Sequence, residues 1–303
     1  MPAVELAGVT KTFGEVVAVN DLSLIVPEGS VFGFIGPNGS GKTTTIRMIV
    51  NIFYPDSGAV RVLGSEMNPS LTQWIGYLPE ERGLYRKMKV RALLEFFGEL
   101  RGGRNVAKEV TEWLERLDLA HCAERRVDTL SKGMSQRVQF IAAVVPEPKL
   151  LILDEPFTGL DPVSADGLRE AILGLRRRGT TVILSTHDMT VAETMCDHIC
   201  MIFRGRKVLD GTLESIQSEY GTDTIRVTLA GGAAALEDLP GVAKTRDLGQ
   251  VQELRLTAGA DPQLVLRALV ERTGVTSFAV ARPSLHDIFV RIAGPAAEEV
   301  ANA

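Results

Sequence analysis

Cysteine is scarce in this chain of 303 residues: only Cys122, Cys196 and Cys200 are present. Their spacing fits neither a metal-ligand pattern nor the disulfide framework of a secreted domain, so we expect a protein of a reducing compartment. The first residues carry no secretory pattern. The sequence also has no uninterrupted apolar stretch of about 18 residues, the length that a membrane-spanning helix needs. We therefore expect a soluble chain.

Concentrated positive charge is also missing. The formal net charge is −5, and the basic residues are scattered apart from one tight cluster, Arg176-Arg177-Arg178. Such a cluster suits the carboxyl end of a solvated helix, where cations interact favourably with the helix dipole. The charge pattern argues against a dedicated DNA-binding protein, and we expect no nucleic-acid partner.

The hydrophobic content of 45% and the length allow two ordinary cores. The first two thirds alternate apolar strand-like runs with amphipathic helices, which predicts an α/β core around a largely parallel sheet. The opening is richer in strands, at residues 4–9, 16–26 and 59–63. From about residue 88 to 148 helical periodicity replaces the strand signal, so we expect a helical insertion in the core. Short apolar runs return at 150–153 and 181–184, as a sheet covered on both faces requires.

One run between an apolar strand pattern and a helical stretch fits the pattern G-x-x-x-x-G-K-[ST]. It comprises Gly36, Pro37, Asn38, Gly39, Ser40, Gly41, Lys42 and Thr43, followed by Thr44. Glycines let backbone N–H groups approach phosphates, Lys42 reaches the β and γ oxygens, and Thr43 can ligate Mg²⁺. The amino terminus of the following helix favours an anion at the same point. The run therefore predicts a site for a nucleoside triphosphate.

Two acids end the buried strand pattern at residues 150–153. Asp154 is placed to bind Mg²⁺ directly or through water, and Glu155 to orient and polarise a water that attacks the γ-phosphate. The alternative is a solvated strand end with two ordinary acids. The position of the pair downstream of a phosphate loop favours the nucleotide interpretation.

A third feature, residues 130–137, precedes one apolar helical face. Ser131 is expected to be the N-cap of that helix. A serine hydroxyl, the N–H of Gly133 and a helix amino terminus together form a second anion site, which one active site does not need. A plain capped helix would explain the run equally well, and only the order of the motifs decides between the two interpretations.

The order of motifs resembles that of the ATP-binding subunits of ABC transporters over roughly residues 4–220. A phosphate loop is followed by an LSGGQ-like signature, an acidic strand end, the run 159–162 (Gly-Leu-Asp-Pro) and the run 185–187 (Ser-Thr-His). The resemblance implies a P-loop NTPase core that binds ATP and Mg²⁺. It also implies a head-to-tail dimer, in which each ATP lies between the phosphate loop of one subunit and the signature of the other.

Roles for further residues follow from the same resemblance. It implies that the signature residues contact the γ-phosphate in trans, that Asp161 lies in a loop crossing the interface, and that His187 senses the γ-phosphate and helps to hold the attacking water. The signature residues are Ser131, Lys132, Gly133 and Met134. Phe13 matches the aromatic that stacks on adenine. Without the family, His187 would be a structural histidine and Phe13 a packing residue.

Two positions depart from the family pattern. Glu80 stands where the family usually has a glutamine that meets Mg²⁺ and leads into the contact with the membrane subunit. A carboxylate can also ligate Mg²⁺, but the metal geometry is then open. The signature reads Leu-Ser-Lys-Gly-Met, which keeps Ser131 and Gly133 and adds the charge of Lys132.

With these two departures and the run 80–85 (Glu-Glu-Arg-Gly-Leu-Tyr), the sequence resembles the bacterial branch of the family that exports sodium ions, drugs or polysaccharides. Past about Thr222 the pattern becomes strand, short helix, hairpin, helix and strand, which predicts a small α+β domain of ferredoxin-like type. We therefore expect an ATP-binding domain over 1–221 and an accessory domain over 222–303, for dimer contacts or regulation.

The leading hypothesis is an ATPase subunit at the cytoplasmic face of the inner membrane. It would work with a separately encoded permease and with a second copy of the same or a homologous subunit. The alternative, a soluble ABC ATPase acting on nucleic acid or ribosomes, would need a long coiled coil or two ATPase modules, and the sequence shows neither. A module that binds without hydrolysis is disfavoured by the presence of Lys42, Asp154, Glu155 and His187.

Overall fold

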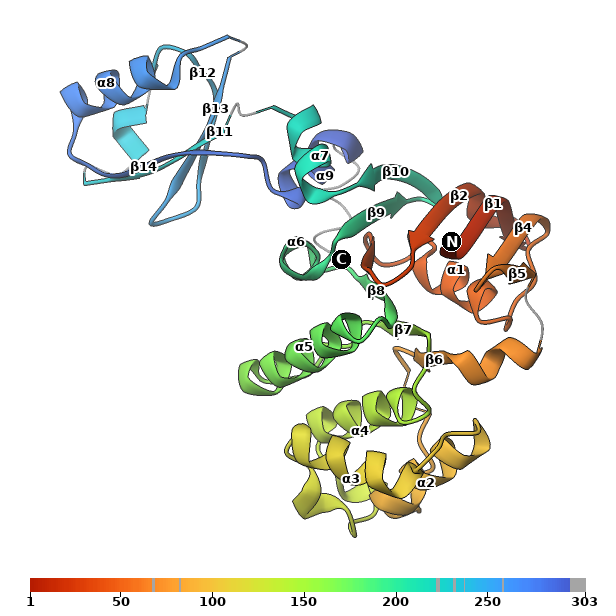
Figure 1. Cartoon of the computed structure of the whole chain (residues 1–303). Coiled ribbons are helices and arrows are strands. Elements are labelled where there is room, and N and C mark those ends of the chain that lie inside the picture. Colours follow the sequence, from red (N-terminus) through yellow and green to blue (C-terminus); the bar gives the residue numbers. More distant parts are fainter. Residues whose placement is uncertain are drawn as a thin grey trace. The chain divides into compact units, whose positions relative to one another are not determined.

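The computed structural model describes residues 1–66, 69–81, 83–221, 224–230, 233–236, 238–257 and 259–294. Arg82 and Thr222, which belong to the patterns above, lie outside the described residues. The chain divides into two compact units, Met1–Thr212 and Leu213–Ala303 (Figure 1). Each unit has its own hydrophobic core, and each is described separately below.

The first unit begins with a four-stranded antiparallel sheet in the order β2-β1-β4-β5. Its strands are β1 (Pro2–Phe13), β2 (Val16–Pro27), β4 (Ser57–Val62) and β5 (Ser65–Glu66). β2 alternates exposed and buried residues, because one face of this sheet packs on the core. β1 and β2 form a hairpin whose last pair is Phe13 with Val16. The strand-rich opening is confirmed.

A six-stranded sheet in the order β10-β9-β3-β8-β7-β6 forms the centre of the unit. Its strands are β3 (Val31–Ile35), β6 (Ile75–Leu78), β7 (Leu150–Asp154), β8 (Thr181–Thr186), β9 (His198–Phe203) and β10 (Arg206–Gly211). All neighbours are parallel except β10, which runs antiparallel to β9. Every residue of β3, β7 and β8 is buried, as expected of strands covered on both faces. The predicted parallel core is confirmed, and its strands end at a common edge.

Helices α1 (Lys42–Ile49), α5 (Pro162–Arg177) and α6 (Met189–Met195) follow strands of this sheet. α5 ends within the arginine cluster, and Arg178 is its C-cap, which confirms the interpretation of that cluster. Between β6 and β7 lie α2 (Val90–Leu100), α3 (Val106–Arg116) and α4 (Lys132–Val144), with the short 3₁₀ segments η2 (Ala120–Cys122) and η3 (Val127–Thr129). Figure 1 shows α2, α3 and α4 gathered next to β6. A further 3₁₀ segment, η1 (Pro69–Trp74), precedes β6.

The second unit contains an antiparallel sheet in the order β12-β13-β11-β14. Its elements are α7 (Leu213–Glu219), β11 (Thr224–Leu229), η4 (Ala233–Leu236), β12 (Val242–Asp247), β13 (Gln252–Leu256), α8 (Pro262–Arg272), β14 (Val275–Ala281) and α9 (Leu285–Ala293). The succession from β11 to β14 is the one that the sequence predicts. The ferredoxin-like assignment stays a prediction. Over the part of the chain that is described, no helix is both long and apolar enough to span a bilayer.

Candidate functional site

The phosphate loop connects β3 to α1 and depends on its glycines. Gly36 has φ +153°, and a Cβ there would lie 2.2 Å from the carbonyl oxygen of Ile202. Gly41 has φ +107°, and a Cβ there would lie 2.4 Å from the carbonyl oxygen of Ala18. Both conformations disfavour any residue with a side chain, and both contacts exclude one sterically. The loop therefore packs so closely on β2 and β9 that only glycine fits at these two positions.

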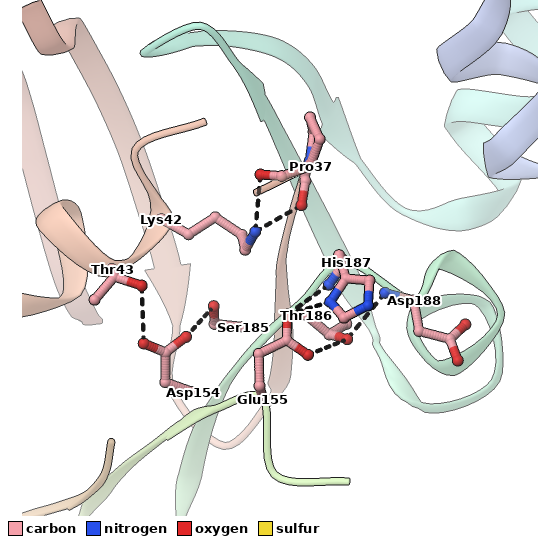
Figure 2. A network of polar contacts seen from close by, with 10 residues as sticks. Pro37, Lys42, Thr43, Asp154, Glu155, Ser185, Thr186, His187 and Asp188 are labelled. Carbon is pink, nitrogen blue, oxygen red and sulfur yellow. Dashed lines mark hydrogen bonds and ion pairs between the residues drawn. The ribbon is translucent and has the colours of Figure 1, made fainter. Parts of the chain in front are cut away.

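Lys42, the first residue of α1, folds back over this loop. Its Nζ donates to the carbonyl oxygens of Gly36, at 2.6 Å, and Pro37, at 3.1 Å (Figure 2). Burial lowers the pKa of Lys42, because desolvation disfavours the ammonium form, while the charges of Glu155, Asp154 and Glu80 act in the opposite direction. A buried cation thus stands over the loop with carboxylates nearby, ready to pair with an anionic ligand.

Asp154 ends β7 beside the first turn of α1. Its Oδ2 accepts a hydrogen bond from the Thr43 hydroxyl at 3.1 Å, and its Oδ1 accepts one from the Ser185 hydroxyl at 2.7 Å. Burial raises the pKa of Asp154, while these two hydrogen bonds act to lower it. The structure therefore brings together two of the three residues that the sequence predicts as metal ligands, Thr43 and Asp154.

Glu155, the next residue, is held by the end of β8. Its Oε1 accepts from the backbone N–H of His187 at 2.9 Å and lies 2.7 Å from Nδ1 of that histidine. Its Oε2 accepts from the Thr186 hydroxyl at 3.3 Å (Figure 2). The backbone of Glu155 has φ +50°, in the left-handed region that non-glycine residues rarely adopt. The two residues predicted as catalytic, Glu155 and His187, are thus in direct contact.

A cavity of about 430 Å³ lies at this edge of the sheet. Several predicted site residues line it: Asn38, Gly39, Gly41, Lys42, Thr43, Thr44, Glu80, Asp154 and Glu155. Phe13 does not, although Val16, its partner in the β1–β2 hairpin, does. The Phe13 ring is 44% exposed and makes an edge contact with Phe53, with 5.3 Å between the ring centroids. The Nζ of Lys11 also lies 5.5 Å from the centroid of this ring, so the aromatic surface next to the cavity wall is partly exposed but already has a cation over it.

Sequence reasoning missed five residues of this wall: Val16, Val17, Ala18, Arg204 and Gly205. The first three belong to β2, and the last two form the turn between β9 and β10. No local motif marks them. A signal exists only at the level of topology, since β9 is parallel to β3 and its carboxyl end must lie at the ligand edge of the sheet.

The donors and acceptors around the cavity fit a nucleotide with Mg²⁺. The Ser40 hydroxyl is buried and, among the residues that the structure describes, has no hydrogen-bond partner, so a phosphate oxygen would satisfy it. Within those residues no group of three or more His, Cys, Asp or Glu side chains could hold a metal. Mg²⁺ takes one or two protein carboxylates and completes its shell with phosphates and water. Thr43, Asp154 and Glu80, the three residues that the sequence predicts as metal ligands, all line the cavity.

The signature lies apart from this wall, because none of Ser131, Lys132, Gly133 and Met134 lines the cavity of its own chain. Ser131 is the N-cap of α4, and its Oγ accepts from the N–H of Met134 at 3.2 Å. A Cβ on Gly133 would lie 3.5 Å from the carbonyl oxygen of Gly159. The signature therefore packs against the loop that leads to Asp161.

Asp161 caps the helix that follows this loop. Its carboxylate accepts from the backbone N–H of Ser164 at 3.0 Å and from the hydroxyl of Ser164 at 2.6 Å. These hydrogen bonds lower the pKa of Asp161 and keep its carboxylate charged at the amino terminus of α5. Asp161 is therefore anchored within its own chain.

A glycine loop between β3 and α1, with two acids at the carboxyl end of β7 in the same parallel sheet, defines a P-loop nucleotide-binding fold. Residues 19–158 match the ABC transporter family, and residues 211–293 match the C-terminal domain of DrrA1-3-like ATP-binding proteins. The chain belongs to the ATP-binding proteins of ABC transporters, with a DrrA-like C-terminal domain.

Individual relatives agree with this assignment. The chain is 38% identical to the uncharacterized ABC transporter ATP-binding protein YhaQ of Bacillus subtilis, over 94% of this chain and 97% of the relative. It is 36% identical to the Nod factor export ATP-binding protein I of Rhizobium sp., over 96% of this chain and 97% of the relative. A solved structure of an ATP-binding subunit of an ABC transporter superposes with a TM-score of 0.69 at 29% identity, over 72% of this chain and 93% of that chain.

Proposed function

We propose that this chain hydrolyses Mg-ATP in a dimer and thereby powers export through a separately encoded membrane permease. The observation that carries the proposal is the paired acidic site. Asp154 is bonded to the Thr43 hydroxyl of the phosphate loop, and Glu155 is clamped by His187 on the same edge of the sheet. A carboxylate for the metal and a carboxylate for water activation are what an in-line displacement at the γ-phosphate requires.

ATP binding is proposed to use the loop and the first turn of α1. Backbone N–H groups of residues 38–41 and the helix amino terminus receive the β-phosphate, together with the hydroxyl of Ser40. Lys42 exchanges its contacts with the loop carbonyls for phosphate oxygens, and Thr44 adds a further donor. Thr43, Asp154 and Glu80 would hold Mg²⁺, which when bound neutralises charge on the β- and γ-phosphates.

Glu155 is proposed to act as the general base. The carboxylate accepts a hydrogen bond from the attacking water and takes its proton as the bond to phosphorus forms. His187 and Thr186 hold both carboxylate oxygens and so fix the orientation of Glu155. His187 does not line the cavity, but 54% of its side chain is accessible, which supports a role for its ring as a sensor of the γ-phosphate.

A head-to-tail dimer would complete the site. The signature residues do not line the cavity of their own chain, which supports a site whose remaining contacts come from the signature of a second subunit, the same or a homologous one. Ser131 and Gly133 would then meet the γ-phosphate at the amino terminus of α4, together with Lys132 and Met134. Asp161, in the loop packed against Gly133, would cross the interface.

Export and location are proposed from the family. A relative of nearly the same length acts in Nod factor export, and the C-terminal domain is DrrA-like. The chain would sit peripherally at the cytoplasmic face of the inner membrane, bound to its permease, with no nucleic-acid partner. The region 222–303 is proposed to be a ferredoxin-like accessory domain for dimer contacts or regulation, and its antiparallel order β12-β13-β11-β14 supports this.

The proposed function is tested with Glu155→Gln. The amide keeps the shape of the side chain but cannot take a proton, so phosphate release from Mg-ATP should become negligible while ATP affinity is kept. Glu112→Gln, a change of a surface acid on α3, serves as the control and should hydrolyse ATP at the wild-type rate. Wild-type turnover in Glu155→Gln would contradict the assignment of the base.

A further inference from the structure

The turn between β9 and β10 is built against the phosphate loop. The N–H of Gly205 donates to the carbonyl oxygen of Ser40 at 2.9 Å, and the carbonyl of Gly205 accepts from the N–H of Asn20 at 2.9 Å. Gly205 has φ +75°, and a Cβ there would lie 2.9 Å from the carbonyl oxygen of Ala18. The backbone of the turn is thereby fastened to both β2 and the loop, and its other residue, Arg204, lines the cavity.

Arg204 is an unusual residue for this turn. It has φ +49°, so both turn residues adopt the left-handed conformation of a type I′ hairpin, where Asn, Asp or Gly is preferred. Its side chain is exposed, with Cζ 5.1 Å from the centroid of the Phe203 ring. No acid within the described ranges forms an ion pair with Arg204. A cation without a carboxylate partner therefore stands on the wall of a nucleotide site.

The neighbours of Arg204 indicate which part of the nucleotide it faces. Gly41 and Gly205 both abut the carbonyl of Ala18, so Arg204 lies where the β2 wall meets the loop. Further along β2, Val16 pairs with Phe13, which marks the end proposed for the base. The groups between the base and the β-phosphate are the ribose and the α-phosphate, and of these two only the phosphate is charged.

We propose that Arg204 binds the nucleotide through its α-phosphate. A guanidinium donates two parallel hydrogen bonds to phosphate oxygens and forms stronger contacts with them than with neutral acceptors. ADP and ATP share this phosphate, so Arg204 contributes to the affinity for both and takes no part in the hydrolytic step. The inference rests on the proposed function, because it assumes that the cavity holds a nucleotide in this orientation.

The test is calorimetric titration of ADP, ATP and GTP into the full-length wild type and three variants. Arg204→Gln should weaken all three nucleotides by about tenfold or more, the size of one charge-assisted contact. Arg204→Lys should give intermediate affinities, because it keeps the charge but loses the fork. The matched control is Arg206→Gln, which removes an exposed arginine two residues away that does not line the cavity, and it should bind like the wild type.

Each other outcome overturns the inference in a distinct way. Wild-type affinities in Arg204→Gln remove Arg204 from the site. A loss confined to ATP and GTP would place the guanidinium at the γ-phosphate, and a loss for ADP and ATP but not GTP would place it at the base. An equal loss of nucleotide affinity in Arg206→Gln would show that the effect comes from the overall charge of the protein and not from a contact of Arg204. Failure of the wild type to bind any nucleotide would overturn the proposed function itself.

Discussion

At the scale of single residues, two charged groups of the site, Lys42 and Glu155, already have hydrogen-bond partners. Lys42 donates hydrogen bonds to the carbonyl oxygens of Gly36 and Pro37. The carboxylate of Glu155 contacts His187 and Thr186. These contacts hold each group in place and prevent the cost of a buried unpaired charge. When a ligand binds, these groups exchange their protein partners for atoms of the ligand. The loop is already ordered, so binding does not have to order it.

Lys42→Ala removes the cation that faces the β- and γ-phosphates. Charge-assisted hydrogen bonds contribute about 1.5–3 kcal/mol each, so the affinity for ATP should fall by about tenfold or more. Hydrolysis should become negligible, because the transition state loses the same contact. Phosphate release and ATP titration on the purified variant measure both effects. Near-normal turnover would show that the loop has been misinterpreted.

Phe13→Ala tests the proposed adenine contact. Phe13 is exposed at the end of the hairpin, makes a T-shaped contact with Phe53 and has the Nζ of Lys11 over its ring, so a base that stacks on that face must displace the ammonium. Aromatic pairs contribute about 0.5–1.5 kcal/mol, and their loss should weaken ATP and ADP about equally, by roughly two- to tenfold. Phe53→Leu is the comparison, because it keeps an apolar side chain beside an intact Phe13. Unchanged affinities in Phe13→Ala would make Phe13 a packing residue.

At the scale of elements, the parallel sheet explains why separate motifs meet. β3, β7 and β8 are adjacent and parallel, with Asp154 paired to Ser185, so the residues that follow each strand fall on one edge. Strand patterns and motifs predict this edge because burial on both faces demands continuous apolar runs. Arg204 was not predictable in the same way. Its place depends on the pairing of β9 with β3, a contact between residues far apart in the sequence.

The second element with a predicted role is the amino terminus of α4. If a partner subunit binds the γ-phosphate there, Glu155→Gln should dimerise when Mg-ATP is added, because the bound ATP joins the two subunits and is not hydrolysed. Adding Ser131→Arg places bulk and charge at the N-cap and should abolish the dimer. Each subunit should still bind ATP through its own loop. Light scattering and ATP titration separate the two effects.

A second variant, Ser131→Asp, tests whether Ser131→Arg abolishes the dimer only because it destabilises α4. Ser131→Asp can also cap α4, and it introduces a negative charge that repels the γ-phosphate. It should therefore prevent the dimer without destabilising the helix. A Glu155→Gln protein that stays monomeric at high concentration, or a Ser131→Arg double variant that dimerises equally well, would be incompatible with the shared site.

At the scale of the whole molecule, the chain consists of two units with separate cores. The second core is built from its own sheet and α8, with Ile225, Leu254 and Leu269 fully buried within it. α7 belongs to this unit by its contacts: Gln217 donates to the carbonyl of Pro283 at 3.0 Å, and Arg291 donates to the carbonyl of Tyr220 at 3.3 Å. The sequence predicts the boundary at residue 221, nine residues after Thr212, where the first unit ends in the structure. Composition marks the start of the next strand, but it cannot show to which core the short helix before that strand belongs.

Truncation separates the two possible boundaries and tests whether the ATP-binding unit stands alone. A chain ending at Gly221 should stay folded and bind Mg-ATP, because every residue lining the nucleotide cavity lies within the first unit. A chain ending at Thr212 should bind equally well and be the more soluble of the two, since it leaves no α7 with an uncovered Ile216. Thermal unfolding with and without Mg-ATP measures this, because bound nucleotide raises the midpoint only of a folded unit. Aggregation of both chains, under conditions that keep the full chain soluble, would show that the first unit needs the second to fold.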